Sequence, residues 1–243
     1  MKLSEQEKAA RKVAFRAMSF REKTDHILTY YKWPIILCLL ALVILVSTLY
    51  RQMTRKEPVL YLAMINVSVG ADLEEQLSDG YLLASGSNPN RQQVYLYRDL
   101  YLSENADTLN HQYEYASQMK LTGAISTRKL DLVLMNREAY DIFSRKGYLL
   151  DLSFLTSEKS RLPDRLTPLL TENEVILHDN SLEVMLGEAT EEQRVSELFY
   201  NAVAAESLPL FRDARFDGEL YLGIMANSER LEEILHYITY LSE

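Results

Sequence analysis

A run of 18 uncharged residues, Trp33 to Tyr50, constrains this chain more than any other feature of its sequence. As an α-helix the run would be roughly 27 Å long, which is enough to span the hydrocarbon core of a bilayer. Aromatic rings, which favour the headgroup layer, lie at both ends of the run. A buried core helix is the alternative, and the basic residues at both ends favour the membrane. The run therefore predicts one transmembrane helix at residues 33–50.

The charges before this run predict its orientation. Residues 1–32 carry eight Lys and Arg against four Asp and Glu, a net charge of +4. Residues 51–58 form a linker with three further bases, as many as the three that stand close to the other end of the helix. The local bases therefore do not set the orientation, and the bases of the whole N-terminal segment do. Because bases stay in the cytoplasm and acids count little, we expect a cytoplasmic N-terminus and an extracellular C-terminal domain. No small-residue cleavage site follows the run before Arg51, so it is interpreted as an uncleaved signal anchor in the cell membrane.

Residues 1–32 also have helical periodicity. Their apolar side chains recur at Val13, Ala17, Phe20, Ile27 and Tyr31, and most bases would face away from these. Such a basic amphipathic segment could lie on anionic headgroups, so lipids are expected partners of both this segment and residues 33–50. The alternative is that the bases act only as a topology signal.

The remainder of the chain is strongly acidic. Residues 57–243 hold 15 bases and 31 acids, a net charge of -16, which excludes a nucleic-acid-binding body. The chain has one cysteine, Cys38, so a disulfide within the chain and a multi-cysteine zinc site are excluded.

After Pro58 apolar runs alternate with helical patterns. The runs predict strands at about 59–67, 93–97, 130–135 and 219–225. The intervening patterns predict helices at about 106–122, 137–146, 190–203 and 228–242. Alternating strands and helices are typical of an α/β fold with a mostly parallel sheet. We expect residues 59–243 to form one domain, with a main lobe from 59–152 and 219–242 and a partial second lobe from 156–215.

Three segments resemble a known family. These are Val59 to Asn66, the segment from Leu130 to Leu152 with its Gly-Tyr-Leu-Leu-Asp-Leu ending, and Tyr221 to Leu241. They are similar to a first strand, an inner strand and helix, and a closing helix of the extracellular solute-binding proteins of ABC importers. The layout, with Tyr30-Tyr31-Lys32-Trp33 at the membrane edge, also resembles uncharacterised single-span proteins of Gram-positive, clostridial-type bacteria. The resemblance implies a type 2 periplasmic-binding-protein-like fold.

This chain departs from that family in length and in tether. Family members have two full lobes and a lipid-bearing cysteine, whereas this body is short and follows a helix. The resemblance therefore implies a reduced binding domain, and solute transport does not follow from it.

Polar residues follow the predicted strands, where the ligand crevice of an open α/β sheet lies. The candidate ligand-binding residues are Asn66, Ser68, Arg98, Asp99, Asn136, Arg137, Asn227 and Ser228. Asn136 and Ser228 have an alternative role, because both stand where helix N-caps are expected.

The sequence contains none of the common phosphate-binding, nucleotide-binding, serine-hydrolase or zinc-protease motifs. Ser126 and Lys129 match Ser-x-x-Lys, yet this segment leads into a predicted strand and no Lys-Thr-Gly follows. We therefore expect no catalytic residues, no metal ligands and no cofactor. The sequence predicts a membrane-anchored, non-catalytic binding or accessory module that recognises a small solute, a peptide or a membrane protein partner. The alternatives are a structural subunit of a membrane complex and an enzyme without a recognisable motif. The ligand and the oligomeric state stay open.

Overall fold

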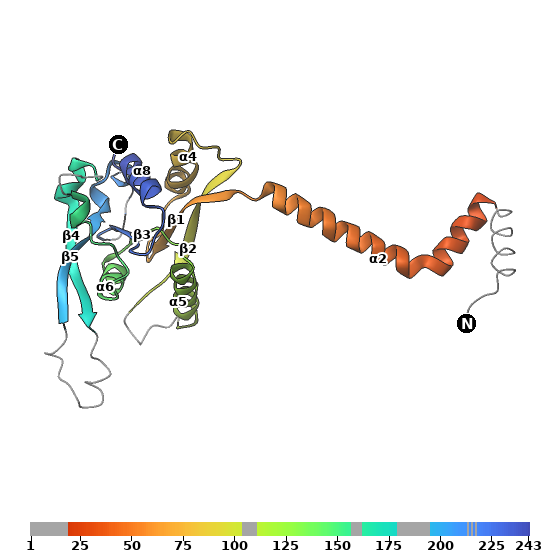
Figure 1. The fold of residues 1–243 in the computed structure, drawn as a ribbon, viewed down its shortest axis with the longest axis horizontal. Coiled ribbons are helices and arrows are strands. Elements are labelled where there is room, and N and C mark those ends of the chain that lie inside the picture. Colours follow the sequence, from red (N-terminus) through yellow and green to blue (C-terminus); the bar gives the residue numbers. More distant parts are fainter. Residues whose placement is uncertain are drawn as a thin grey trace, which may run out of the picture. The chain divides into compact units, whose positions relative to one another are not determined.

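The computed structural model describes residues 19–103, 111–156, 162–178, 195–212, 214, 216 and 218–243. The chain divides into two compact units, residues 1–55 and residues 56–243. The first contains helix α2 (Phe20–Thr54), and the second contains an α/β body (Figure 1). Most of the predicted amphipathic segment, residues 1–18, lies outside the described residues.

Helix α2 contains the apolar run. Its section Lys32–Tyr50 has a mean hydropathy of 2.4 and is not buried. The hydroxyl of Thr48 donates a hydrogen bond to the carbonyl oxygen of Ile44 (2.7 Å), so this polar side chain is satisfied within the helix. Among the described residues, this is the one helix that is long and apolar enough to cross a membrane.

The body is built on one six-stranded mixed sheet with the strand order β2-β1-β3-β6-β5-β4. The strands are β1 (Glu57–Ile65), β2 (Gln92–Leu100), β3 (Leu132–Met135), β4 (Leu170–His178), β5 (Val195–Ala204) and β6 (Tyr221–Ile224). Strand β1 is parallel to β2 and β3, whereas β6, β5 and β4 are each antiparallel to their neighbours. The predicted α/β class is confirmed, and the parallel arrangement holds for β2, β1 and β3 only.

Strand β5 replaces the part of the helix predicted at residues 190–203 that the structure describes, and residues 190–194 lie outside the described residues. The spacing of Val195, Leu198, Phe199 and Ala202 also fits one face of a helix. In the structure, residues 195–203 pair with β4 along an antiparallel hairpin. The helix prediction was wrong because Val, Phe and Tyr suit strands and because pairing with a distant segment outweighs local spacing.

The segment after α6 (Arg137–Arg145) fills the space between β6 and β5. Only Val203 and Ala204 of β5 pair with β6. Beyond them, the amide of Leu150 donates to the carbonyl of Ile224 (2.8 Å), and that of Leu152 donates to the carbonyl of Tyr200 (2.6 Å). Residues 156–215, expected as a partial second lobe, thus contribute β4 and β5 to the same sheet as β1.

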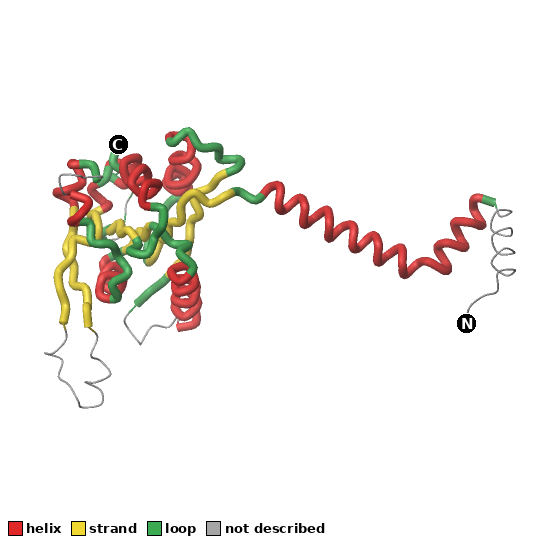
Figure 2. Tube along the Cα trace, viewed as in Figure 1, coloured by secondary structure: helices red, strands yellow, loops and turns green. Residues whose placement is uncertain are grey.

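Helices cover both faces of the sheet. Helices α4 (Tyr81–Ala84) and α8 (Leu231–Leu241) lie on one face, and α5 (His111–Ser126) and α6 lie on the other (Figures 1 and 2). Strand β1 contributes Leu60, Leu62 and Met64 to the first core and Ala63 and Ile65 to the second. Burial on both faces explains why this strand is a continuous apolar run. The described part of the body also contains the short helices η2 (Ser153–Thr156), η3 (Asp164–Leu169), η5 (Ala205–Ser207) and η6 (Pro209–Phe211).

One helical stretch, residues 71–84, contains a wide turn that docks on α8. It consists of α3 (Ala71–Glu75), the π-helical turn η1 (Gln76–Gly80) and α4. The carbonyl of Leu77 accepts a hydrogen bond from the buried Tyr237 hydroxyl (2.7 Å), and that of Gln76 accepts one from Tyr240 (3.0 Å). A Cβ at position 80 would lie 2.9 Å from the Tyr240 hydroxyl, so glycine permits this close approach.

We predict that Tyr237→Phe destabilises the body by about 1 to 2 kcal/mol, because it leaves a buried carbonyl without its donor. Urea unfolding of the purified protein in detergent, followed by circular dichroism, measures this. Tyr240→Phe is the matched control and should cost less, because its hydrogen bond is exposed to water. Equal losses in the two variants would contradict the prediction.

Candidate functional site

The sheet brings six of the eight candidate residues to one edge. Because β1, β2 and β3 are parallel, their carboxyl ends share an edge, which we name the carboxyl edge. Asn66, Ser68, Asn136 and Arg137 follow β1 and β3 there, and Arg98 and Asp99 belong to the end of β2. Strand β6 runs in the opposite direction, so Asn227 and Ser228 lie at the other edge, which we name the amino edge.

Asn66 and Asn136 use their amides within the fold. The side-chain nitrogen of Asn66 donates to the carbonyl of Leu102 (2.6 Å) and to Oδ1 of Asn136 (3.2 Å), and its Oδ1 accepts from the Leu102 amide (2.9 Å). Oδ1 of Asn136 also accepts from the amide of Ala139 (3.1 Å) and so caps α6, which confirms the capping interpretation. The two amides join the ends of β1 and β3 to the loop after β2.

Arg98 and Asp99 lie on the edge strand β2. Arg98 forms an ion pair with Glu74 of α3. Asp99 has a left-handed backbone (φ 53°), and its carbonyl accepts a hydrogen bond from the Tyr113 hydroxyl (2.5 Å). Both residues therefore connect β2 to neighbouring helices.

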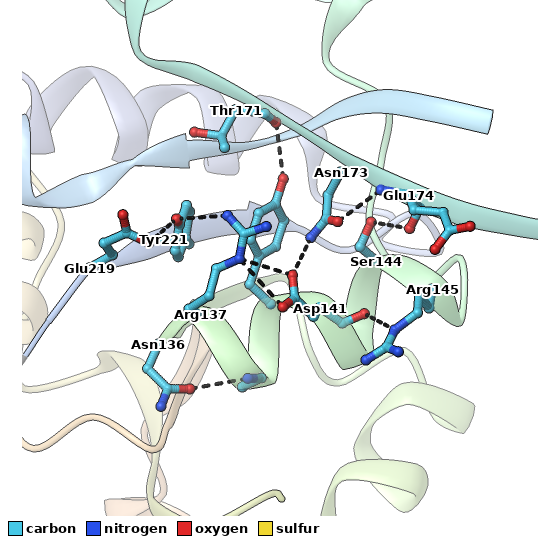
Figure 3. A network of polar contacts seen from close by, with 12 residues as sticks. Asn136, Arg137, Asp141, Ser144, Arg145, Thr171, Asn173, Glu174, Glu219 and Tyr221 are labelled. Carbon is cyan, nitrogen blue, oxygen red and sulfur yellow. Dashed lines mark hydrogen bonds and ion pairs between the residues drawn. The ribbon is translucent and has the colours of Figure 1, made fainter. Parts of the chain in front are cut away.

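Arg137 lies in a polar network that joins α6 to β6 (Figure 3). Its Nε is 3.1 Å from Asp141, and its Nη1 donates to the Tyr221 hydroxyl (3.2 Å), which in turn donates to Glu219 (2.6 Å). The hydrogen bond with Tyr221 is the main cause that raises the pKa of Arg137. The guanidinium also lies over the stacked rings of Tyr140 and Tyr221, 5.7 Å from each centroid.

Three residues that the sequence did not single out extend this network into the core. The Tyr140 hydroxyl lies 3.0 Å from the carbonyl of Thr171 and 2.8 Å from Oδ1 of Asn201. Asn201 donates to Ser144 (2.7 Å), and Ser144 donates to the carbonyl of Glu174 (2.8 Å). Burial raises the pKa of Tyr140, so its hydroxyl keeps its proton and holds α6 against β4 and β5. A sequence feature that could have predicted this network is Ser144, a polar residue one turn after Tyr140 on the apolar face of α6.

A buried carboxylate organises the amino edge. Asp131 is fully buried and accepts hydrogen bonds from the Tyr61 amide (2.9 Å) and the Ser228 hydroxyl (2.6 Å). It also pairs with Arg230 (3.2 Å), whose guanidinium lies over the Tyr61 ring (5.0 Å). Arg230 stands at the N-cap position of α8, so Ser228 serves the carboxylate and is not the cap. Asn227 donates to the carbonyl of Ile125 (2.8 Å).

The carboxyl edge also has a hollow of about 660 Å³ that is open to solvent. Its walls come from the loop after β1, from α3 and η1, from the segment around η6, and from the end of α8. Ser68 is the one sequence-predicted site residue that lines it. The described lining residues are Ser68, Val69, Gly70, Asp72, Leu73, Gln76, Pro209, Leu210, Ala214, Phe216, Tyr240, Leu241 and Glu243.

The described residues form one long apolar helix and a mixed-sheet α/β body. They contain no group of three or more His, Cys, Asp or Glu residues that could hold a metal ion. No protein-family model, no curated protein and no solved structure matches this chain. The resemblance to solute-binding proteins therefore remains a prediction.

We predict that Asp131→Ala destabilises the body by about 2 to 3 kcal/mol, because it leaves the Tyr61 amide and the Ser228 hydroxyl without their acceptor and removes the counter-charge of Arg230. Ser228→Ala should cost only about 1 kcal/mol, since two partners of the carboxylate remain. Thermal unfolding in detergent compares the two variants. A loss for Asp131→Ala no larger than that for Ser228→Ala would show that the carboxylate is not central.

Proposed function

We propose that this chain is a membrane-anchored, extracytoplasmic binding module that holds its ligand in the hollow at the carboxyl edge. The observation that carries the proposal is the position of this hollow. It lies beyond the carboxyl end of β1, and ligands of open α/β sheets bind beyond the carboxyl ends of the strands.

The size and the walls of the hollow support binding. Its volume of about 660 Å³ lies within the range of ligand pockets, about 300 to 1,000 Å³. Leu73, Leu210 and Phe216 offer apolar contact, while Gln76 and Asp72 offer polar groups. This combination suits recognition by shape and hydrogen bonding, so we propose a non-catalytic role.

A specific observation also favours the structural-subunit alternative. The β4–β5 hairpin exposes Leu177 (49%), Val195 (50%), Leu198 (66%) and Tyr200 (45%). By the register of the hairpin, Leu198 and Tyr200 lie on one face, and such an exposed apolar pair on a two-stranded hairpin is typical of a protein contact. A partner that co-purifies with the native chain and is lost in Leu198→Ser would favour this second function.

Helix α2 and the charges around it support a membrane anchor. We propose that the apolar section of α2 is an uncleaved signal anchor and that the bases of residues 1–32 stay in the cytoplasm. The acidic body then lies outside the cell. The resemblance to extracellular solute-binding proteins agrees with this side of the membrane.

We predict that Gly70→Trp abolishes ligand binding and leaves the fold intact. Gly70 lines the hollow, has an ordinary negative φ of -69°, and has no atom within 4 Å of the place where a Cβ would stand. A ligand at about 100 times its Kd stabilises the folded state by about 2.7 kcal/mol, so a panel of solutes and peptides is screened by thermal shift. The stabilisation by any hit should disappear in Gly70→Trp.

Gly123→Trp is the matched control. Gly123 lies on the exposed side of α5, and a Cβ there also meets nothing within 4 Å. This variant should respond to ligands like the native protein. If no compound raises the melting temperature, or if Gly70→Trp responds as well as the control, the proposed site is wrong.

We predict that the two sides of α2 label differently in intact cells. In a Cys38→Ser background, which removes the one native thiol, a cysteine is introduced by Thr122→Cys in the body or by Ser4→Cys in the tail. A membrane-impermeant maleimide should label position 122 in intact cells and position 4 only after lysis. The reverse pattern would refute the proposed orientation.

A further inference from the structure

A second hollow continues the first along the helical stretch 71–84. It has a volume of about 280 Å³ and is lined by Asp72, Glu75, Gln76, Asp79, Gly80 and Leu83. Asp72 and Gln76 line both hollows, so the two meet at these residues. We name the combined surface the acidic groove.

The charges on the described lining residues of the groove have one sign. Its described lining residues include the carboxylates of Asp72, Glu75, Asp79 and Glu243 and no Lys, Arg or His. In the part of the chain that the structure describes, no ion pair joins any of these four carboxylates to a base. Glu74, on the same helical stretch, is instead paired with Arg98 and lies outside the groove. The described lining of the groove therefore presents negative charge that none of these ion pairs compensates.

Apolar side chains lie beside these carboxylates. Leu73, Leu210, Phe216 and Leu241 contribute to the first hollow. Leu83 contributes to the second, and it is 68% exposed although it is a large apolar residue. A ligand that matches both features has cationic groups and apolar groups in alternation.

The length of the groove favours a chain over a compact solute. From Asp72 to Leu83 the helical rise is roughly 16 Å, and an extended peptide advances about 3.3 Å per residue. About five peptide residues would cover this distance. Both hollows are open to solvent, whereas a small-molecule pocket encloses most of its ligand.

From the sign of the charge, the apolar neighbours and the length, we propose that the acidic groove binds a basic, partly apolar peptide segment of a partner protein. This inference rests on the proposed binding function and names its ligand class. The net charge of -16 on residues 57–243 would also speed the encounter with a basic segment.

Three capped hexapeptides with a fluorescent label test the proposal: a Lys-Leu repeat, a Glu-Leu repeat and a Lys-Ser repeat. Binding to the full-length protein in a non-ionic detergent is measured by fluorescence anisotropy. We expect the Lys-Leu peptide to bind at least about tenfold more tightly than the Glu-Leu peptide, and the Lys-Ser peptide to be intermediate. Raising the salt concentration should weaken the Lys-Leu complex.

Two double variants separate the groove from general charge attraction. Asp72→Asn with Glu75→Gln removes two groove carboxylates and should weaken Lys-Leu binding about fivefold, as expected for two exposed pairs. Glu172→Gln with Glu197→Gln changes the net charge equally on the exposed β4–β5 hairpin and should leave the affinity within about twofold. Leu83→Ser should weaken the Lys-Leu complex and spare the Lys-Ser complex.

The results that overturn this inference differ from those that overturn the proposed function. Equal binding of the Lys-Leu and Glu-Leu peptides, or equal weakening by the two double variants, rejects a basic peptide as the ligand. If a neutral or anionic ligand binds and is blocked by Gly70→Trp, the binding function stands and this inference fails. If no ligand of any charge is sensitive to Gly70→Trp, the binding function fails as well.

Discussion

The arrangement of this body depends on the hydrogen bonds and the ion pair that the buried carboxylate of Asp131 forms. This carboxylate lies fully buried at the start of β3 and is held by the Tyr61 amide of β1, by Ser228 and by Arg230. A buried carboxylate is tolerated only when such partners are present, so the central strand pair and the turn after β6 must come together. That turn leads into α8, and α8 meets the wide helical turn at Leu77 through Tyr237. The position of the hollow beside the end of α8 thus follows from contacts that begin at the opposite edge of the sheet.

The parts of the fold that the sequence predicts are those with a local cause. Strands β1 and β3 are buried on both faces, which requires the continuous apolar runs seen in their sequences. Asn136 has the side chain that an N-cap needs, and Glu138 follows in the first turn of α6. Strand β5 has no such local cause, because the spacing of its apolar residues fits a helix and its conformation depends on pairing with β4. The direction of β6 could not be predicted either, because a buried four-residue apolar strand fits a parallel and an antiparallel pair equally well.

The candidate site likewise has features that the local sequence predicts and features that only the tertiary fold brings together. The rule that ligands bind beyond the carboxyl ends of strands identifies Ser68 and the edge where the hollow lies. The rule does not distinguish side chains that can contact a ligand from side chains whose polar groups bond within the fold. The side-chain amides of Asn66 and Asn136, for example, form hydrogen bonds with Leu102, with Ala139 and with each other. It also cannot find Leu210, Phe216 and Tyr240, which are more than 130 residues away in sequence from Ser68 and reach the hollow only through the tertiary fold. Residue type and local pattern therefore locate the edge, while the walls need the structure.

The direction of β1 determines at which end of this strand the hollow and the acidic groove begin. The body begins at Lys56, and the chain enters the sheet at Glu57, the amino end of β1. The nine residues of β1 then carry the chain roughly 30 Å to the carboxyl edge. The acidic groove begins close to this edge, at Asp72, and follows the helical stretch 71–84, which leads back to Gln92, the partner of Glu57 at the start of β1. A peptide segment bound along the groove would therefore run from the carboxyl end of β1 back towards the end at which β1 and β2 begin.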